Sequence, residues 1–405
     1  MWKTSEGSTG RLLELCSGYF LFYVITGVAV KYFLGKADLG LPAMHAIQYL
    51  TYSTVGGASV ALLVVLVRRW YHLQSVHPVQ WGRWRFPSEF FYIVPSGVCT
   101  AVVIPTTTLM YTLPISVMVA MVIMRGAIIV VSRIVDSVQI RQGLLKKKVY
   151  VQENVAVVFA LLAVGTKIVW TPSLVNPLVD YLQGIGISAA GSLRLEASAR
   201  DSFVFLRSPA AMGILSSYIT AYAIRIYIMN YYKNTRGKGQ KLDNKAFFAI
   251  EQIAAFTTMV LVSVFLVLVP HRVGWTSSQL QVFRDSVVNP HSLWGWAILS
   301  GTAFGIVAFF SVFIFMFKGR TATFAGLVNR LTSLIAGTTA TLVFHFAFGG
   351  RFPSVADWLA LLFILIAVGF LTQAERRRRI ELAEQHEIEA PWDRRQGVQS
   401  AASTA

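Results

Sequence analysis

Residues 112–135, TLPISVMVAMVIMRGAIIVVSRIV, and residues 322–345, ATFAGLVNRLTSLIAGTTATLVFH, decide the fold of this chain. Both segments are long and apolar enough to cross a bilayer, which takes about 20 apolar residues in a helix. Each carries an arginine well inside the apolar run, Arg125 in the first and Arg330 in the second. An arginine at that depth costs at least a few kcal/mol unless it faces a cavity or a partner. Two arginines at matching places predict a site for a negatively charged group.

The composition is that of a membrane protein. Hydrophobic residues make up 55% of the 405 residues, and only 14% are charged. Such a balance is typical of polytopic membrane proteins and not of soluble domains. The net charge of +17 lies mostly in short loops between apolar segments, where positive charge orients membrane helices. We expect no nucleic-acid partner, because no soluble domain is left to bind one.

Metal and disulfide chemistry find no support in the sequence. The two cysteines, Cys16 and Cys99, both fall inside apolar segments, and the seven histidines show no metal-binding spacing. We therefore expect no metal, no cofactor and no catalytic residues.

Apolar runs predict an all-α polytopic membrane protein with about ten transmembrane helices. The predicted helices cover residues 12–34, 44–67, 86–110, 112–135, 151–170, 209–231, 246–269, 293–317, 322–345 and 355–371. The segment 171–207 is mixed in charge and is expected to hold a short surface helix.

The predicted organisation is a pair of five-helix repeats. The first repeat covers 1–171, a linker follows over 172–207, the second repeat covers 208–372, and a charged tail covers 373–405. We expect the tail to form a short helix and then to be disordered.

Basic loops follow every second predicted helix. By the positive-inside tendency this pattern places both termini in the cytoplasm and the linker on the other side. Golgi, endoplasmic-reticulum, plastid and bacterial inner membranes are all consistent with the pattern.

The two halves match each other in sequence. A shift of 204 residues places Ser96 and Gly97 on Ser300 and Gly301. Arg125 follows Gly97 by 28 residues, and Arg330 follows Gly301 by 29. Since each half holds an odd number of helices, the halves are predicted to be inverted relative to each other. Inverted repeats with a site near the midplane are a transporter architecture.

Further polar residues lie at membrane depth in segment 246–269. Glu251 is a candidate proton-coupling group, a candidate counter-charge for an empty cavity, and the alternative partner of Arg125 in a structural ion pair. The shift that relates the halves places Gln48 on Gln252, which predicts a polar pair facing the cavity. We expect Asp136 and Arg225, near helix ends, to reach the membrane surface.

Two stretches resemble a known family. Residues 94–117, VPSGVCTAVVIPTTTLMYTLPISV, resemble the helix 3–4 region of the drug/metabolite transporter superfamily, in its nucleotide-sugar and triose-phosphate translocator branch. Residues 326–331, GLVNRL, are similar to the GALNK motif of nucleotide-sugar carriers, with Arg330 replacing lysine. They are also similar to the lysine–arginine pair of phosphate-ester translocators, with Asn329 replacing the lysine. The FYNN motif of nucleotide-sugar carriers is absent, and residues 249–252 read AIEQ there.

The resemblance implies ten helices in inverted repeats, a central cavity and antiport by alternating access. We expect a transporter, not an enzyme, that moves a small organic anion such as a nucleotide sugar or phosphate ester. The expected substrate-binding residues are Arg125, Asn329, Arg330, Gly326, Gln252 and Gln48. The expected partners are the solute and the lipid bilayer, and homodimer formation is left open.

Two other functions stay open at this point. One is a proton-coupled drug or metabolite efflux carrier that uses Glu251. The other is a membrane-integral enzyme acting on lipids, which requires convergent carboxylates or histidines at one membrane face.

Overall fold

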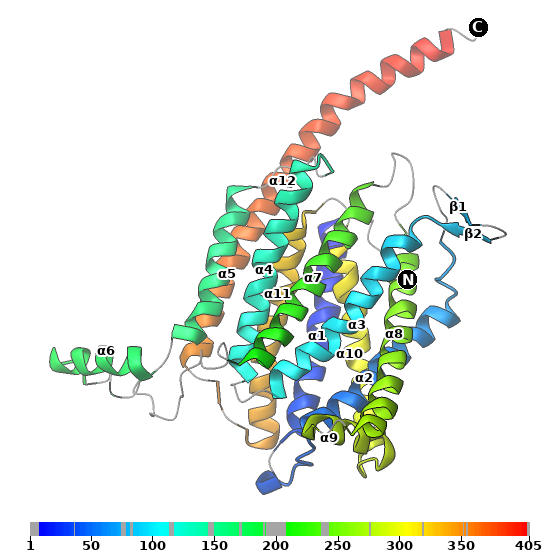
Figure 1. Cartoon of the computed structure of the whole chain (residues 1–405). Helices are drawn as coiled ribbons and strands as arrows, with labels where there is room; N and C mark the ends of the chain where they lie inside the picture. Colours follow the sequence, from blue (N-terminus) through cyan, green and yellow to red (C-terminus); the bar gives the residue numbers. More distant parts are fainter. Residues whose placement is uncertain are drawn as a thin grey trace.

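The structure, a computed structural model, is a bundle of long helices with one short hairpin (Figure 1). It describes residues 8–35, 37–73, 78–81, 84–112, 117–144, 150–169, 172–188, 191, 208–235, 243–274, 277–317, 320–350, 352–353 and 355–402.

The helices and strands follow one another along the chain in this order. They are α1 (Thr9–Phe33), the 3₁₀ helix η1 (Ala37–Leu39), α2 (Ala46–Val67), β1 (Pro78–Trp81), β2 (Trp84–Pro87), α3 (Phe90–Thr112), α4 (Val117–Arg141), α5 (Val151–Val169), α6 (Pro172–Gly184), α7 (Pro209–Thr235), α8 (Asn244–Val273), α9 (Ser278–Val288), α10 (Trp294–Phe315), α11 (Ala322–Phe348) and α12 (Val355–Ala402).

Eight helices in the described part of the chain are long and apolar enough to span a membrane. They are α1, α2, α3, α7, α8, α10, α11 and α12. The outward face of α8 is apolar as lipid contact requires, since Leu261, Phe265 and Leu268 are all more than half exposed. The prediction of an all-α multi-pass membrane protein is therefore confirmed.

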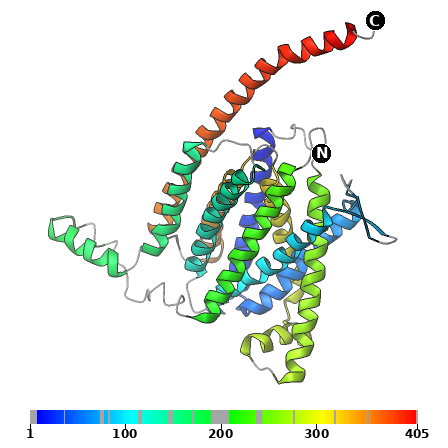
Figure 2. The same cartoon turned by 45° about the horizontal axis from the view of Figure 1, so that its top comes forward.

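Each of the ten predicted apolar segments is helical over most of its length. The predicted surface helix also exists, as α6, which projects sideways from the bundle beyond the end of α5 (Figures 1 and 2). The predicted start of the third helix at residue 86 is wrong. Residues 84–87 pair with 78–81 as an antiparallel hairpin, because aromatic residues there favour a strand.

The prediction for the charged tail is also wrong. The structure continues α12 to Ala402, where the sequence predicted a short helix followed by disorder. Residues 374–390 are rich in glutamate, arginine and alanine, which have high helix propensity. A helix already started in the bundle can therefore continue outward without a break (Figure 1).

Helices from the two halves of the chain pack against one another. α1 contacts α10 and α11, while α7 contacts α3 and α4. In addition α2 packs on α10, α8 on α3, and α5 on α12. The matched glycines lie at two of these contacts. A Cβ at Gly97 would overlap the backbone of Glu251 in α8, and one at Gly301 would overlap the backbone of Ser53 in α2.

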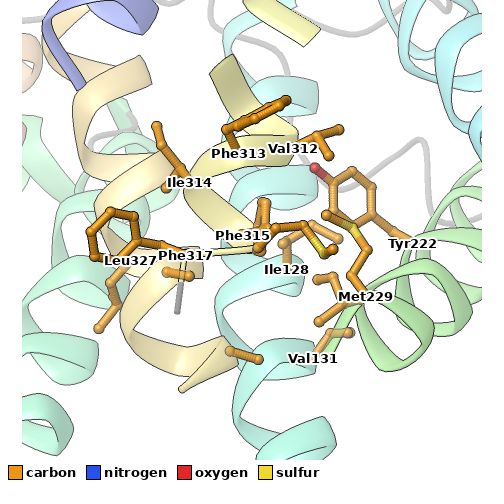
Figure 3. Packing of buried hydrophobic residues seen from close by; sticks show 14 of the residues in the cluster. Ile128, Val131, Tyr222, Met229, Val312, Phe313, Ile314, Phe315, Phe317 and Leu327 are labelled. Carbon is orange, nitrogen blue, oxygen red and sulfur yellow. The ribbon is translucent and has the colours of Figure 1, made fainter. Parts of the chain in front are cut away.

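One end of the bundle carries many of the described polar contacts between helices, and we call it the basic end. There α1, α5 and α11 begin, α4 and α7 end, and α12 leaves the bundle with Arg376 and Arg377 exposed. Just inside it lies a layer of buried apolar side chains (Figure 3). We call this the apolar layer; it includes Ile128, Val131, Met229, Phe315 and Leu327.

Candidate functional site

Arg330 lies in α11 between this apolar layer and the middle of the bundle. The residue is only 9% exposed, and its Nε and Nη2 atoms have no hydrogen-bond partner in the described structure. Its Cζ atom lies 4.8 Å from the centre of the Tyr222 ring in α7. A guanidinium over an aromatic face gains cation–π attraction, but this leaves most of the cost of burying the charge uncompensated.

Arg125 lies in α4 and reaches toward α1. It is 6% exposed, and its Nη2 atom donates a hydrogen bond of 2.7 Å to the hydroxyl of Tyr23. Its Cζ atom lies 5.6 Å from the centre of the same ring. A neutral hydroxyl again leaves the positive charge without an opposite charge.

The two arginines belong to one cluster. Both interact electrostatically with Tyr19 of α1 and with Tyr218 of α7. The rings of Tyr19 and Tyr23 lie 5.5 Å apart, as do those of Tyr218 and Tyr222. Each pair is spaced by four residues, which places both rings on one helix face. The central cluster, as we name it, consists of Arg125, Arg330, Tyr19, Tyr23, Tyr218 and Tyr222.

Glu251 does not neutralise this cluster by pairing with Arg125. Its carboxylate accepts from Arg225, with Nε–Oε1 and Nη2–Oε2 distances of 2.8 and 3.2 Å. Ser96 and Thr100 of α3 also donate to Oε1, at 2.7 and 3.2 Å. Over the described residues, neither arginine of the central cluster forms an ion pair.

Arg225 is the residue that sequence reasoning missed. The expectation that it reaches the membrane surface is wrong, because it is 6% exposed and paired inside the bundle. Its Cζ atom lies 5.9 Å from the centre of the Tyr222 ring. The spacing Tyr218, Tyr222, Arg225 on one helical face was the available signal, since residues three and four apart share a face.

Asn329 and Gly326 lie beside the cluster in structural roles. Asn329 is fully buried, accepts from the hydroxyl of Tyr19 at 3.4 Å and donates to Ser311 of α10 at 3.0 Å. It therefore positions Tyr19. A Cβ at Gly326 would overlap the hydroxyl of Ser132, so this glycine permits the close contact between α4 and α11.

The two predicted glutamines are not joined to the arginines. Gln252 is 7% exposed, and its Nε2 atom has no partner within the described structure. Gln48 is half-buried in the first turn of α2. No described hydrogen bond connects either glutamine to Arg125 or Arg330. Of the six predicted site residues, the structure therefore places Arg125 and Arg330 in one cluster, and Asn329 contacts this cluster through Tyr19.

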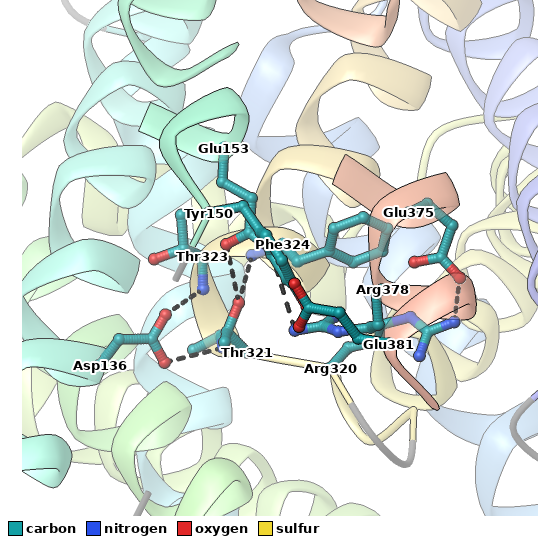
Figure 4. A network of polar contacts seen from close by, with 11 residues as sticks. Asp136, Tyr150, Glu153, Arg320, Thr321, Thr323, Phe324, Glu375, Arg378 and Glu381 are labelled. Atoms are coloured by element: carbon teal, nitrogen blue, oxygen red, sulfur yellow. Dashed lines mark hydrogen bonds and ion pairs between the residues drawn. The ribbon is translucent and has the colours of Figure 1, made fainter. Parts of the chain in front are cut away.

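Asp136 ties α4 to α11 at the basic end (Figure 4). Its carboxylate accepts from the backbone N–H groups of Ala322 and Thr323, at 2.9 and 2.6 Å. The expectation that Asp136 reaches the membrane surface is wrong, because it is fully buried. A carboxylate at a helix N-terminus satisfies free N–H groups and complements the helix dipole.

Charged side chains of α5 and α12 and of Arg320, just before α11, meet beside Asp136. Arg320 pairs with Glu375, and Arg378 lies 3.9 Å from Glu153 (Figure 4). Tyr150 donates to Glu381 at 2.6 Å and lies under the Arg378 guanidinium. We name this set the terminal network: Asp136, Tyr150, Glu153, Arg320, Glu375, Arg378 and Glu381.

The structure also has a cavity of about 400 Å³ between α1 and α10. Neither Arg125 nor Arg330 lines it. Its lining residues are Tyr32, Phe33, Leu293, Trp296, Leu299 and Ser300. These residues are mostly aromatic or aliphatic and offer no charge, so this cavity is not the predicted anion site.

The fold and its composition define an all-α multi-pass membrane protein. No protein-family model matches the sequence, and no curated protein sequence matches it significantly. Among the residues that the structure describes, no cluster of three histidine, cysteine, aspartate or glutamate side chains is arranged to hold a metal ion.

Proposed function

We propose that the protein is a secondary transporter that moves a small organic anion, such as a nucleotide sugar or a phosphate ester, by alternating-access antiport. Arg125 and Arg330 hold the anionic group of the solute. The observation that carries the proposal is the buried guanidinium of Arg330, whose Nε and Nη2 have no partner in the described structure.

An unpaired buried charge needs an explanation, because its desolvation is costly, no described ion pair offsets it, and the cation–π contact with Tyr222 offsets only part of it. A bound anion supplies the missing opposite charge. A guanidinium presents planar paired donors that match phosphate and carboxylate oxygens, and such charge-assisted bonds are strong away from water. The tyrosine hydroxyls nearby add neutral donors without changing the charge.

The helix contacts support ten spans in two inverted repeats. Exchanging α1–α5 in order with α7, α8, α10, α11 and α12 turns the α1–α10 contact into α7–α3, and both contacts exist. The same exchange turns α1–α11 into α7–α4 and α2–α10 into α8–α3, which also exist. It further matches the tyrosine pair of α1 with that of α7, and Arg125 with Arg330. A site shared by matched helices of inverted repeats is the arrangement of alternating-access carriers.

The orientation follows from the same arrangement. The basic end faces the cytoplasm in this proposal, because positive residues are retained on that side. Both termini then lie in the cytoplasm, and α6 lies on the opposite side.

Antiport follows from the charge of the empty site. Without a solute, Arg125 and Arg330 repel each other. This repulsion opposes any motion that brings the two side chains closer or excludes water from around them. A bound anion removes this opposition, so the loaded carrier reorients faster than the empty one. Net uniport is therefore expected to be slower than exchange.

The two other functions receive less support. Proton coupling through Glu251 would require Arg225 to leave first, because Arg225, Ser96 and Thr100 already occupy the carboxylate. A lipid-modifying enzyme needs free convergent acids, whereas Asp136 and Glu375 are engaged in contacts between helices. Glu251 lies where nucleotide-sugar carriers have the FYNN motif, and an unpaired negative charge there would repel a nucleotide. Its pairing with Arg225 limits this repulsion.

Counterflow into proteoliposomes tests the proposal. Labelled nucleotide sugars, sugar phosphates, carboxylates and neutral amino acids are offered to the wild-type protein and to Arg330→Ala. Arg141→Ala is the matched control, because Arg141 is an exposed arginine at the end of α4. We expect exchange of anions alone, lost in Arg330→Ala and retained in Arg141→Ala. Exchange of a neutral solute that survives Arg330→Ala would refute the anion site.

A further inference from the structure

Three guanidinium groups lie in one group of tyrosines, two of them beside the Tyr222 ring and one beside Tyr23, and only one of the three pairs with a described carboxylate. Arg330 and Arg225 lie 4.8 and 5.9 Å from the centre of the Tyr222 ring. These two arginines also interact electrostatically with each other. Arg125 joins them through Tyr23. Glu251 is the one carboxylate described in contact with this group, and it binds Arg225 alone of the three.

The position of Glu251 is fixed independently of the ligand site. Ser96 and Thr100 of α3 both donate to its Oε1 atom. Gly97, between them, allows the α8 backbone at Glu251 to approach α3 closely. The carboxylate is therefore held against α3, and it holds the fork of Arg225 by two bonds. Arg225 cannot turn toward a solute without losing both.

We propose that Glu251 sets the number of positive charges that the site offers to its anion. By binding Arg225 in two places it withholds the third guanidinium, so the site presents the charges of Arg125 and Arg330. The site then favours anions with two negative charges over anions with more. Glu251 acts through Arg225 and not by touching the solute, so it is a positioning residue that determines charge specificity. This inference rests on the proposed anion transport.

A simpler role for the pair is to join α7, α8 and α3. The two roles differ in what they do to selectivity. Loss of a structural contact weakens the binding of all anions by a similar factor. Release of a third charge changes the ratio between anions of different charge, because each negative charge gains from the extra positive one.

The experiment compares two inorganic probes on the purified full-length protein in detergent. Sulfate carries two negative charges and pyrophosphate about three at pH 7.5. Apparent dissociation constants come from the concentration dependence of thermal stabilisation. We expect Glu251→Gln to shift the preference toward pyrophosphate by about tenfold relative to wild type, from the Coulomb energy of one more nearby charge.

The double variant Arg225→Gln/Glu251→Gln removes the pair together and is expected to restore the wild-type ratio. Arg225→Gln alone leaves the carboxylate near the site and is expected to shift the ratio toward sulfate. If Glu251→Gln cannot be purified, the Arg225→Gln variant decides the question. Comparing the ratio within each variant cancels losses that affect both probes.

Two failures can be told apart. If sulfate stabilises wild type no more than it stabilises Arg330→Ala, the anion site itself is refuted, and the inference falls with it. If sulfate binding depends on Arg330 but neither Glu251→Gln nor Arg225→Gln changes the ratio of the sulfate and pyrophosphate dissociation constants, the anion site stands and the role of Glu251 is only structural.

Discussion

The central cluster and the terminal network bury the same residue type in opposite ways. In the terminal network, Arg320 faces Glu375 and Arg378 faces Glu153. In the central cluster, Arg125 and Arg330 face tyrosine hydroxyls and rings. Within the described structure, Oε1 of Glu153 and Nε of Arg320 also lack a hydrogen-bond partner. The two regions therefore differ in whether each arginine pairs with a carboxylate, and not in whether every polar atom has a hydrogen bond. The paired arginines of the terminal network join helices, and in the proposed function the unpaired ones of the central cluster hold the anion.

The two regions share their helices and are separated by the apolar layer. α4 carries both Arg125 and Asp136, and α11 carries Arg330 a little beyond the residues that Asp136 binds. Ile128 lies between Arg125 and Asp136 along α4, and Leu327 lies between Ala322 and Arg330 along α11. Both belong to the apolar layer (Figure 3). In the proposed cycle, solute reaches the cytoplasm only when this layer opens. The terminal network then joins the helices that must separate for this opening, and the central cluster binds the solute before release.

The largest expected effect is on stability, from breaking a pair in the terminal network. Arg320→Met leaves the buried Glu375 without its positively charged partner, although Thr9 still donates to it at 3.2 Å, and removing one member of a buried pair costs about 3–5 kcal/mol. Thermal unfolding in detergent measures this loss. The double variant Arg320→Met/Glu375→Met removes both charges and is expected to recover most of the stability. If Arg320→Met were as stable as the wild-type protein, pairing with a carboxylate would not be what distinguishes the two regions.

The opposite result is expected for the same substitution in the central cluster. Arg330→Met removes a buried charge that has no carboxylate, so the free energy of unfolding should stay the same or increase. Anion exchange should fall by about 100-fold, or about 2.7 kcal/mol, because the solute loses its charge-assisted bonds. Unfolding and counterflow are measured on one preparation. A loss of stability equal to that of Arg320→Met, with exchange intact, would reverse the assignment of the two regions.

A smaller effect is expected from Asp136, which belongs to the terminal network but binds backbone and not arginine. Asp136→Asn keeps one acceptor oxygen and loses the charge at the N-terminus of α11, which costs about 1–2 kcal/mol. Hydrogen exchange at residues 322–326 should become about tenfold faster, from local opening of that turn. The α10 backbone, which Asp136 does not bind, serves as the internal control. Unchanged exchange at 322–326 would show that the carboxylate does not hold α11.

The contrast between the regions also shows how far the sequence alone could predict the site. Long apolar runs gave the helices, and depth within them gave Arg125 and Arg330, because a charge inside a span is rare. Arg225 and Asp136 lie near helix ends, where snorkelling is the ordinary expectation. Their burial depends on how α7 meets α8 and how α4 meets α11. The spacing in α7 shows that Arg225 shares a face with Tyr218 and Tyr222, but it does not specify which helix that face meets. Only the structure shows the contacts that bury Arg225 and Asp136.

The smallest expected effect concerns Tyr222, whose ring lies beside both an unpaired and a paired arginine. The contact described for it with Arg330 is made by the ring face, at 4.8 Å, and no described hydrogen bond involves its hydroxyl. Tyr222→Phe should therefore leave sulfate binding nearly unchanged. Tyr222→Leu removes the cation–π attraction, worth about 0.5–2 kcal/mol, and should weaken sulfate binding about twofold to thirtyfold. Equal losses in both variants would assign the contact to the hydroxyl, and the tyrosine would then be a direct donor to the anion.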